Sequence, residues 1–215
     1  IGRDPASTIH LDGAVVSWHH ARLDAVPGGG HRLTDLGSTN GTFVNRTRVT
    51  DSQLLQEGDV IQVGPFRLVY QLQGVHQYAA AGGLRLDGIA VTREVGRGEH
   101  TRRILNEISL SIYPREFVAL VGTSGAGKST LMKALSAVVR AEGGQVLVNG
   151  DSLYDQFDLY RTMIGYVPQD DILHADLKVE EALYYAAKLR LPPDTSGDEI
   201  DRRIDDVLKE VEMVA

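Results

Sequence analysis

Residues 122–130 read Gly122-Thr123-Ser124-Gly125-Ala126-Gly127-Lys128-Ser129-Thr130. The stretch matches the pattern G-x-x-x-x-G-K-[ST], whose glycines let backbone N–H groups close around phosphate oxygens. In such a loop the lysine, Lys128, reaches the β- and γ-phosphates, and the hydroxyl of Ser129 is placed to bind Mg²⁺. We therefore predict that these nine residues hold the phosphates of a nucleoside triphosphate.

The segments on both sides of this loop fit a strand–loop–helix unit. The run Phe-Val-Ala-Leu-Val at 117–121 is unbroken and apolar, which is typical of a parallel strand buried on both faces. After the loop, apolar residues recur at helical spacing, at Leu131, Ala134, Leu135 and Val138. A helix is therefore predicted over 128–139, with its N-terminus directed at the bound anion.

The composition is that of an ordinary globular protein with one or two domains. The 215 residues include 22 basic and 29 acidic ones, a net charge of −7, which does not indicate a nucleic-acid-binding protein. The absence of cysteine rules out disulfides and fits a reducing cytosol. No apolar run approaches the roughly 20 residues of a membrane-spanning helix, and no signal peptide opens the chain. Because the first residue is Ile1, we expect the sequence to be a fragment of a longer protein.

The two halves of the chain have different patterns. Residues 1–72 contain short β-branched or aromatic runs between dense turn residues, which predicts an all-β sandwich. Residues 73–83 have neither a strand pattern nor a helix pattern and are predicted to be a linker. From residue 84 strands alternate with helices, so residues 84–215 are predicted to be an α/β domain.

The expected elements can be listed for each half. In the sandwich, strands are predicted at 14–16, 42–44, 60–63 and 66–70. In the α/β half, further strands are predicted at 108–112, 145–149 and 163–167. A second helix is expected over about 177–190, where Pro192-Pro193 stops it, and a last helix carries Ile200, Ile204, Val207, Leu208 and Val211 on one face.

Three short motifs stand in order in the first half: Gly2-Arg3, Ser17-x-x-His20 and Gly37-Ser38-Thr39-Asn40-Gly41-Thr42. With the later Gly58-Asp59-x-Ile61-x-Val63-Gly64, they resemble the forkhead-associated (FHA) domain over essentially all of residues 1–72. The resemblance implies a phosphothreonine-binding sandwich whose first strands are missing ahead of Ile1. Trp18 stands where this family usually has a polar or basic residue, so an unusual peptide preference is expected.

The resemblance implies a binding role for four residues. Arg3 and Ser17 would donate to the phosphothreonine, whose phosphate carries nearly two negative charges and three acceptor oxygens. Thr39 would also face the phosphate, and Asn40 would hydrogen-bond the peptide backbone. The alternative is a sandwich that keeps the scaffold and has lost phosphopeptide binding.

Structural roles are implied for Gly2, His20 and Gly41. His20 would support the loop that carries Ser17, and Gly41 would permit the tight turn that presents Asn40. Several histidines are close in sequence, namely His10, His19, His20 and His31. They lack the ligand spacing of a metal site, so no metal is predicted there.

A second resemblance covers the α/β half. Residues 166–171, Tyr-Val-Pro-Gln-Asp-Asp, place Gln169 41 positions after Lys128 (169 − 128) and resemble the Q-loop of ATP-binding cassette (ABC) proteins. Residues 104–112 and 144–150 resemble the same family, and 179–192 its G-subfamily, the White type. The resemblance implies that the nucleotide is ATP, that Ser129 and Gln169 contact Mg²⁺, and that Lys128 and Gln169 are the catalytic residues within this sequence.

The sequence also departs from the cassette pattern. Arg115 replaces a usual glycine and is expected to be tolerated if its turn avoids a positive φ. The aromatic residue that normally stacks on adenine is absent from 89–95, where Arg93 could stack instead, although a solvent-facing arginine is the simpler interpretation. The sequence ends before the signature motif, the Walker B acid and the catalytic glutamate of the family. We therefore expect this fragment to bind ATP without turnover.

Together the two halves of the chain resemble an actinobacterial-type FHA–ABC exporter, which implies a location at the cytoplasmic face of the cell membrane. They imply that ATP hydrolysis by paired cassettes drives transport, while the FHA module provides kinase-linked regulation. The implied partners are a second cassette in a homodimer, a C-terminal transmembrane domain in the same chain, a phosphothreonine-bearing protein or segment, and a Ser/Thr protein kinase. No nucleic acid is expected as a partner.

Two alternatives remain open at this point. One is a soluble ABC-type ATPase that the FHA module recruits to a phosphorylated partner, and the other is a phosphopeptide-binding adaptor with a vestigial cassette. Thr195 lies in the acidic stretch Pro193-Asp194-Thr195-Ser196-Gly197-Asp198-Glu199 and is predicted to be exposed. No role is assigned to it, because most such threonines are never phosphorylated.

Overall fold

The computed structural model describes residues 1–78, 83–96, 98, 101–168 and 176–213. The chain divides into two compact units. One unit contains Ile1–Ala79 together with Val167–Ala215, and the other contains Ala80–Tyr166. Each unit is described by itself below.

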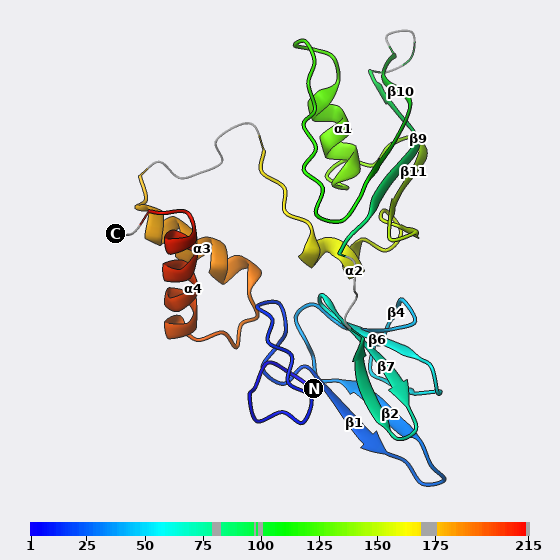
Figure 1. Cartoon of the computed structure of the whole chain (residues 1–215), viewed down its shortest axis with the longest axis vertical. Helices are drawn as coiled ribbons and strands as arrows, with labels where there is room; N and C mark the ends of the chain where they lie inside the picture. Colours follow the sequence, from blue (N-terminus) through cyan, green and yellow to red (C-terminus); the bar gives the residue numbers. More distant parts are fainter. Residues whose placement is uncertain (79–82, 97, 99–100, 169–175, 214–215) are drawn as a thin grey trace. The chain divides into compact units, whose positions relative to one another are not determined.

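The first unit contains a β-sandwich (Figure 1). One sheet has the order β1-β2-β5, with β1 (Ala21–Ala25), β2 (His31–Asp35) and β5 (Ser52–Leu54). The other has the order β4-β3-β6-β7-β8, with β3 (Thr42–Val44), β4 (Thr47–Arg48), β6 (Val60–Val63), β7 (Phe66–Gln71) and β8 (Gly74–Tyr78). All of these pairings are antiparallel. The predicted all-β sandwich is confirmed.

A closed apolar core holds the sandwich together. Inward-facing residues of both sheets are almost fully buried, among them Leu33, Val44, Ile61, Leu68 and Tyr70. Burying such side chains stabilises a fold by about 1.5–3 kcal/mol each. The core is built entirely from the first 79 residues, because each member of this cluster lies in the sandwich or its loops.

Two predictions for this half were wrong. Residues 14–16 form a turn, in which Val16 N–H donates to Gly13 O at 2.9 Å. Val16 is apolar because it enters the core from a loop, not because it lies in a strand. The predicted linker at 73–83 is also too long, since Gly74–Tyr78 forms β8 and pairs with β7 through a two-residue connection. Gly74, the first residue of β8, has φ 148°, a conformation that favours glycine.

The second unit contains an antiparallel sheet and short helices. Its strands have the order β10-β9-β11-β12, with β9 (Leu86–Val95), β10 (Arg102–Ile112), β11 (Gly143–Val148) and β12 (Asp151–Ser152). Helix α1 (Lys128–Leu135) packs on β9 and β10 through Leu131, Ala134 and Leu135. Helix α2 (Phe157–Tyr160) and the 3₁₀-helix η2 (Arg161–Met163) follow β12.

The strands predicted at 117–121 and 163–167 are not formed. Phe117 is 93% exposed and Val121 is 90% exposed. A buried parallel strand needs neighbours on both sides, and no strand of the described residues pairs with 117–121. The predicted helix at 128–139 is confirmed but ends at Leu135, where Ala137 takes φ 57°.

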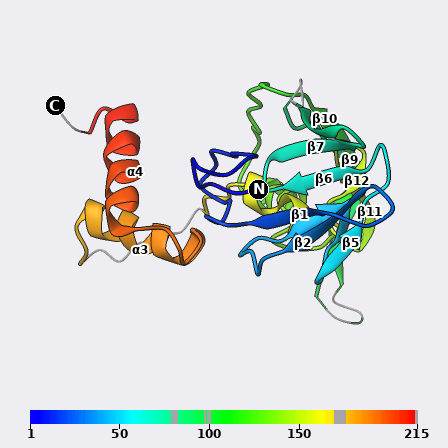
Figure 2. The same ribbon diagram turned by 90° about the horizontal axis from the view of Figure 1, so that it is seen from below.

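A helical hairpin completes the first unit. Helices α3 (Val179–Arg190) and α4 (Gly197–Glu210) lie next to each other in two views (Figures 1 and 2). Ile200, Ile204 and Leu208 of α4 are buried, and Leu183, Tyr184 and Ala187 of α3 pack against them. Ser196 caps α4 by accepting the N–H of Glu199 at 3.2 Å. Both predicted helices are confirmed. Among the described helices, none combines the length and apolarity needed to span a membrane.

Candidate functional sites

The N-terminal segment brings Gly2 and Arg3 beside Ser17 and Trp18. Arg3 N–H donates to Ser17 O at 3.0 Å, and Asp4 N–H donates to Trp18 O at 3.1 Å. A Cβ on Gly2 would lie 2.1 Å from Trp18 O, so only glycine allows this close approach. The first two predicted motifs are therefore adjacent in space.

The guanidinium of Arg3 is buried, with a relative exposure of 4%. Its Nε–H donates to Val16 O at 2.9 Å, and its centre lies 5.4 Å from the ring centroid of Trp18. The remaining donors face an acidic segment of the same unit: Nη2 donates to Asp194 Oδ1 at 3.1 Å, and Nη1 donates to Glu199 Oε2. A buried guanidinium is stable only with such partners.

His20 connects the two loops that carry the predicted phosphate-facing residues. Its Nδ1 accepts the N–H of Ser17 at 3.1 Å, and its Nε2 donates to Gly41 O at 3.2 Å. These two partners require the neutral ring with the proton on Nε2. Burial lowers the pKa of His20 below its usual value, more than the hydrogen bond to Gly41 raises it.

The loop after β2 is organised by Asp35, which was missed at the sequence level. Asp35 accepts the hydroxyls of Ser38 and Thr42, both at 2.6 Å, and the backbone N–H groups of Gly37 and Ser38 at 2.9 Å. Burial raises the pKa of Asp35, but these hydrogen bonds outweigh it and hold the pKa below its usual value. An Asp two residues before a Gly is a known turn signal and could have identified this residue.

The same loop places Thr39 and Asn40 beside Ser17. Ser17 Oγ accepts the N–H of Thr39 at 3.2 Å, and Asn40 Nδ2 donates to Val15 O at 2.7 Å. Thr39 is exposed, whereas Ser17 and Asn40 are buried. Gly41 has φ 84°, a value that permits the turn and favours glycine. The four residues predicted to bind phosphothreonine thus come from adjacent segments.

The second candidate site is the loop before α1, where residues 122–130 lie together. Gly125 and Gly127 have φ 79° and 91°, so both positions use conformations that favour glycine. Lys128 Nζ donates to Gly122 O at 2.7 Å and to Thr123 O at 2.8 Å. The first turn of α1 carries no acidic residue and no side-chain cap, so its N-terminus stays suited to an anion.

Four further residues were discussed for the cassette from its sequence, namely Ser129, Gln169, Arg93 and Arg115. Ser129 is exposed in the first turn of α1, whereas Gln169 lies outside the described residues. Arg93 is paired with Glu142 and donates to Arg140 O at 3.0 Å, so it is engaged within the unit. Arg115 has φ 64°, so its turn does not avoid a positive φ, and the condition under which this arginine was expected to be tolerated is not met.

Comparison with known families agrees with both halves of this description. The FHA domain family matches residues 1–64, and the ABC transporter family matches residues 105–215. The chain is 39% identical over 219 residues to the ABC transporter ATP-binding/permease protein Rv1747 of Mycobacterium tuberculosis, covering 99% of this chain and 24% of that protein. It is 40% identical over 112 residues to ABC transporter G family member 22 of Arabidopsis thaliana, covering 51% of this chain and 14% of that protein.

Among solved structures, the chain is similar to the dimeric cassette MJ0796 bound to ADP and Pi. The identity is 26% and the TM-score 0.52, covering 59% of this chain and 57% of that one. The chain spans about a quarter of the length of Rv1747. It therefore belongs to the ABC transporter ATPase family and carries an FHA domain ahead of its portion of the ATP-binding cassette.

Proposed function

We propose that this chain is the cytoplasmic ATP-binding part of an ABC exporter in which an FHA domain couples transport to threonine phosphorylation. The observation that carries the proposal is the similarity to an ATP-binding/permease protein across 99% of this chain, both halves included. A phosphate-binding loop and an arginine-centred site then occur in one polypeptide. The first would serve transport and the second regulation.

The ATP site would work by positioning. Lys128 Nζ, which contacts two loop carbonyls, would turn to the β- and γ-phosphates when nucleotide enters. The N–H groups of the loop and of the first turn of α1 would surround the phosphates. Ser129 and Gln169 have the oxygen atoms that Mg²⁺ prefers, so we assign them to the metal.

Hydrolysis is proposed for the whole transporter, with a second cassette completing the site. The similar cassette MJ0796 is a dimer in its ADP-bound structure, and a homodimer is accordingly our proposal here. Energy from hydrolysis would be used by a membrane-spanning part elsewhere in the same polypeptide, as the description of Rv1747 as a permease suggests.

The FHA site would bind a phosphothreonine through Arg3, Ser17 and Thr39, with Asn40 holding the peptide backbone. A guanidinium fork beside hydroxyl and backbone donors suits a phosphate with three acceptor oxygens. The fixed distance between the two loops, which His20 joins, supports this assignment. A Ser/Thr kinase would supply the modification.

The test is made on the native full-length protein. Its intact mass is measured, and membranes are washed with alkaline carbonate. Retention in the membrane pellet with a mass well above 23.4 kDa is the expected result. Release into the supernatant would contradict the exporter and favour the second candidate, a soluble ATPase recruited to a phosphorylated partner.

A further inference from the structure

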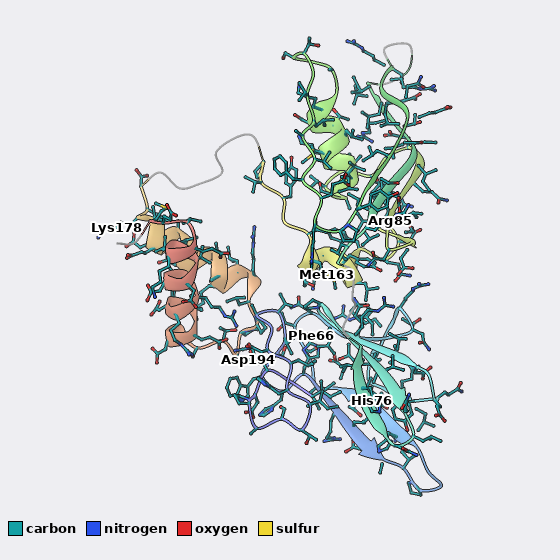
Figure 3. All side chains as sticks on the ribbon, in the orientation of Figure 1. Phe66, His76, Arg85, Met163, Lys178 and Asp194 are labelled. Atoms are coloured by element: carbon teal, nitrogen blue, oxygen red, sulfur yellow. The ribbon has the colours of Figure 1, made fainter. Side chains whose placement is uncertain are left out.

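The Arg3 site already holds an acidic segment of its own chain. Residues 194–199 comprise the end of the connection between α3 and α4 and the first turn of α4, and they belong to the same compact unit as Arg3. Figure 3 shows Asp194 beside the N-terminal segment, 191 residues away in sequence. With Arg3 only 4% exposed, a peptide cannot reach its guanidinium while this segment is in place.

The contacts to this segment have the pattern expected for a bound phosphate. Asp194 Oδ1 accepts from Arg3 Nη2 at 3.1 Å, and Asp194 Oδ2 accepts the backbone N–H of Trp18 at 2.7 Å. Glu199 accepts from the other guanidinium nitrogen, and Thr195 Oγ1 lies 3.3 Å from Nη2. Two carboxylates thus supply the negative charge and the acceptor oxygens that a phosphate would bring.

The segment is fixed at both ends. Pro192 and Pro193 precede it, and Ser196 caps α4 within it. Glu199 also accepts from Arg203 at 3.0 Å. Burial raises the pKa of Glu199, but the hydrogen bonds from Arg203 and Arg3 outweigh it and hold the pKa below its usual value. The carboxylate of Glu199 is therefore charged at neutral pH.

Thr195, predicted to be exposed, is in fact buried at 5% relative exposure. Its hydroxyl faces Arg3 and not solvent. The burial of Thr195 is consistent with the two carboxylate contacts on either side of it. A kinase could reach this threonine only after the segment has left.

We infer that the acidic segment 194–199 is an intramolecular ligand of the Arg3 site, which a phosphothreonine peptide must displace. The inference rests on the proposed phosphothreonine binding of the FHA domain. Each carboxylate carries one charge and two acceptor oxygens, whereas a phosphate concentrates nearly two charges and three acceptor oxygens on one group and therefore binds a guanidinium more tightly than either carboxylate does. The segment therefore competes with a phosphorylated ligand without excluding it.

The experiment uses the 215-residue chain and the double variant Asp194→Asn, Glu199→Gln, which keeps the shape of both side chains. The matched control is Asp206→Asn, Glu210→Gln, which removes the same charge from exposed positions of α4. Two measurements are made: the amide resonance of Trp18 by NMR, and the affinity for an immobilised degenerate phosphothreonine peptide library. Unfolding followed by Trp18 fluorescence checks that all chains are folded.

The expected result is a shifted Trp18 amide and about 10-fold tighter capture of the double variant, the size expected when about nine in ten chains are docked. The control should match the wild type in both measurements. Arg3→Ala should shift the Trp18 amide as well but lose capture by the library.

The two proposals fail in different ways. An unshifted Trp18 amide together with unchanged capture would overturn the intramolecular ligand and leave phosphothreonine binding intact. A shifted amide with no capture of any chain would instead overturn phosphothreonine binding, while the docked segment would stand. Tighter capture of the control variant as well would show a general charge effect and would also overturn the inference.

Discussion

The core apolar residues of the sandwich are buried, whereas the apolar residues directly before the glycine-rich loop of the cassette are exposed. In the sandwich, Ile61 and Leu68 have no exposed surface. Directly before the glycine-rich loop 122–130, Phe117 and Val121 are at least nine-tenths exposed although they belong to an equally apolar run. An apolar run therefore predicts burial only where partner strands are present, since a strand is stabilised by its neighbours.

The largest effect is expected from a pair of substitutions that compares a buried with an exposed apolar residue. Ile61→Ala should destabilise the chain by about 2–5 kcal/mol, because it leaves a cavity in a closed core. Phe117→Ala, the matched change at an exposed position, should stay within about 0.5 kcal/mol. Urea unfolding followed by circular dichroism measures both. Equal destabilisation by the two changes would contradict the exposure of Phe117.

A second change separates the two regions by function. Lys128→Ala should weaken binding of a fluorescent ATP analogue with Mg²⁺ by about 10- to 150-fold, since a hydrogen bond to a charged group is worth about 1.5–3 kcal/mol. Lys133→Ala, an exposed lysine in the last turn of the same helix, is the control. Unfolding monitored by Trp18, the single tryptophan, should not change. Undiminished binding would refute the phosphate-binding role of Lys128.

A third prediction concerns how the stability of the sandwich depends on pH through His20. The pKa of His20 is lowered in the folded chain, so the unfolded chain takes up the proton first as the pH falls. The contribution of neutral His20 to the free energy of unfolding is therefore complete above pH 6.5, the pKa of His20 in the unfolded chain. This contribution is lost as the pH falls from there through the pKa of His20 in the folded chain. Unfolding followed by Trp18 fluorescence between pH 7.5 and 5 measures the loss.

His20→Gln is the control for this pH effect. It should be less stable at neutral pH and should lack the part of the pH dependence that His20 causes. An identical pH dependence in both chains would contradict the assignment to His20, since the other histidines are the same in both.

The smallest effect is expected in the cassette region. Arg115 has φ 64°, a conformation that costs a residue with a Cβ about 1–2 kcal/mol. Arg115→Gly should relieve this cost and lose about 0.5–1 kcal/mol to backbone entropy, so a net stabilisation of up to about 1.5 kcal/mol is expected. Thermal unfolding by circular dichroism measures it, and Arg102→Gly in β10 should destabilise instead. A destabilised Arg115→Gly chain would show that the side chain has a role of its own.

Local patterns in the sequence predicted those elements whose signals are local. The strands at 42–44 and 60–63 match β3 and β6, and Ile200 and Ile204 lie on the buried face of α4 as their spacing predicted. The runs at 14–16, 117–121 and 163–167 were misassigned because apolarity alone does not reveal whether a partner strand exists. β8 was missed because its short pattern follows a two-residue turn that carries little signal.

The residues around Arg3 could be predicted in part, because their motifs are also local patterns in the sequence. Gly2, Arg3, Ser17 and His20 were identified by the order of their motifs, and the structure brings them together. Asp35 was missed although its turn signal was local. The contact of Arg3 with Asp194 spans 191 residues, and no local pattern contains a contact of that range.

The exposure of Phe117 and Val121 also matters while the chain is being made. Proteins emerge from the ribosome N-terminal end first, at about 5–20 residues per second. The described strands β1–β8 have all emerged once residue 78 has left the ribosome, so the core that they enclose can close during synthesis. The stretch 117–121 emerges later with no described strand beside it, and it is therefore the segment of the nascent chain where chaperones would be expected to bind.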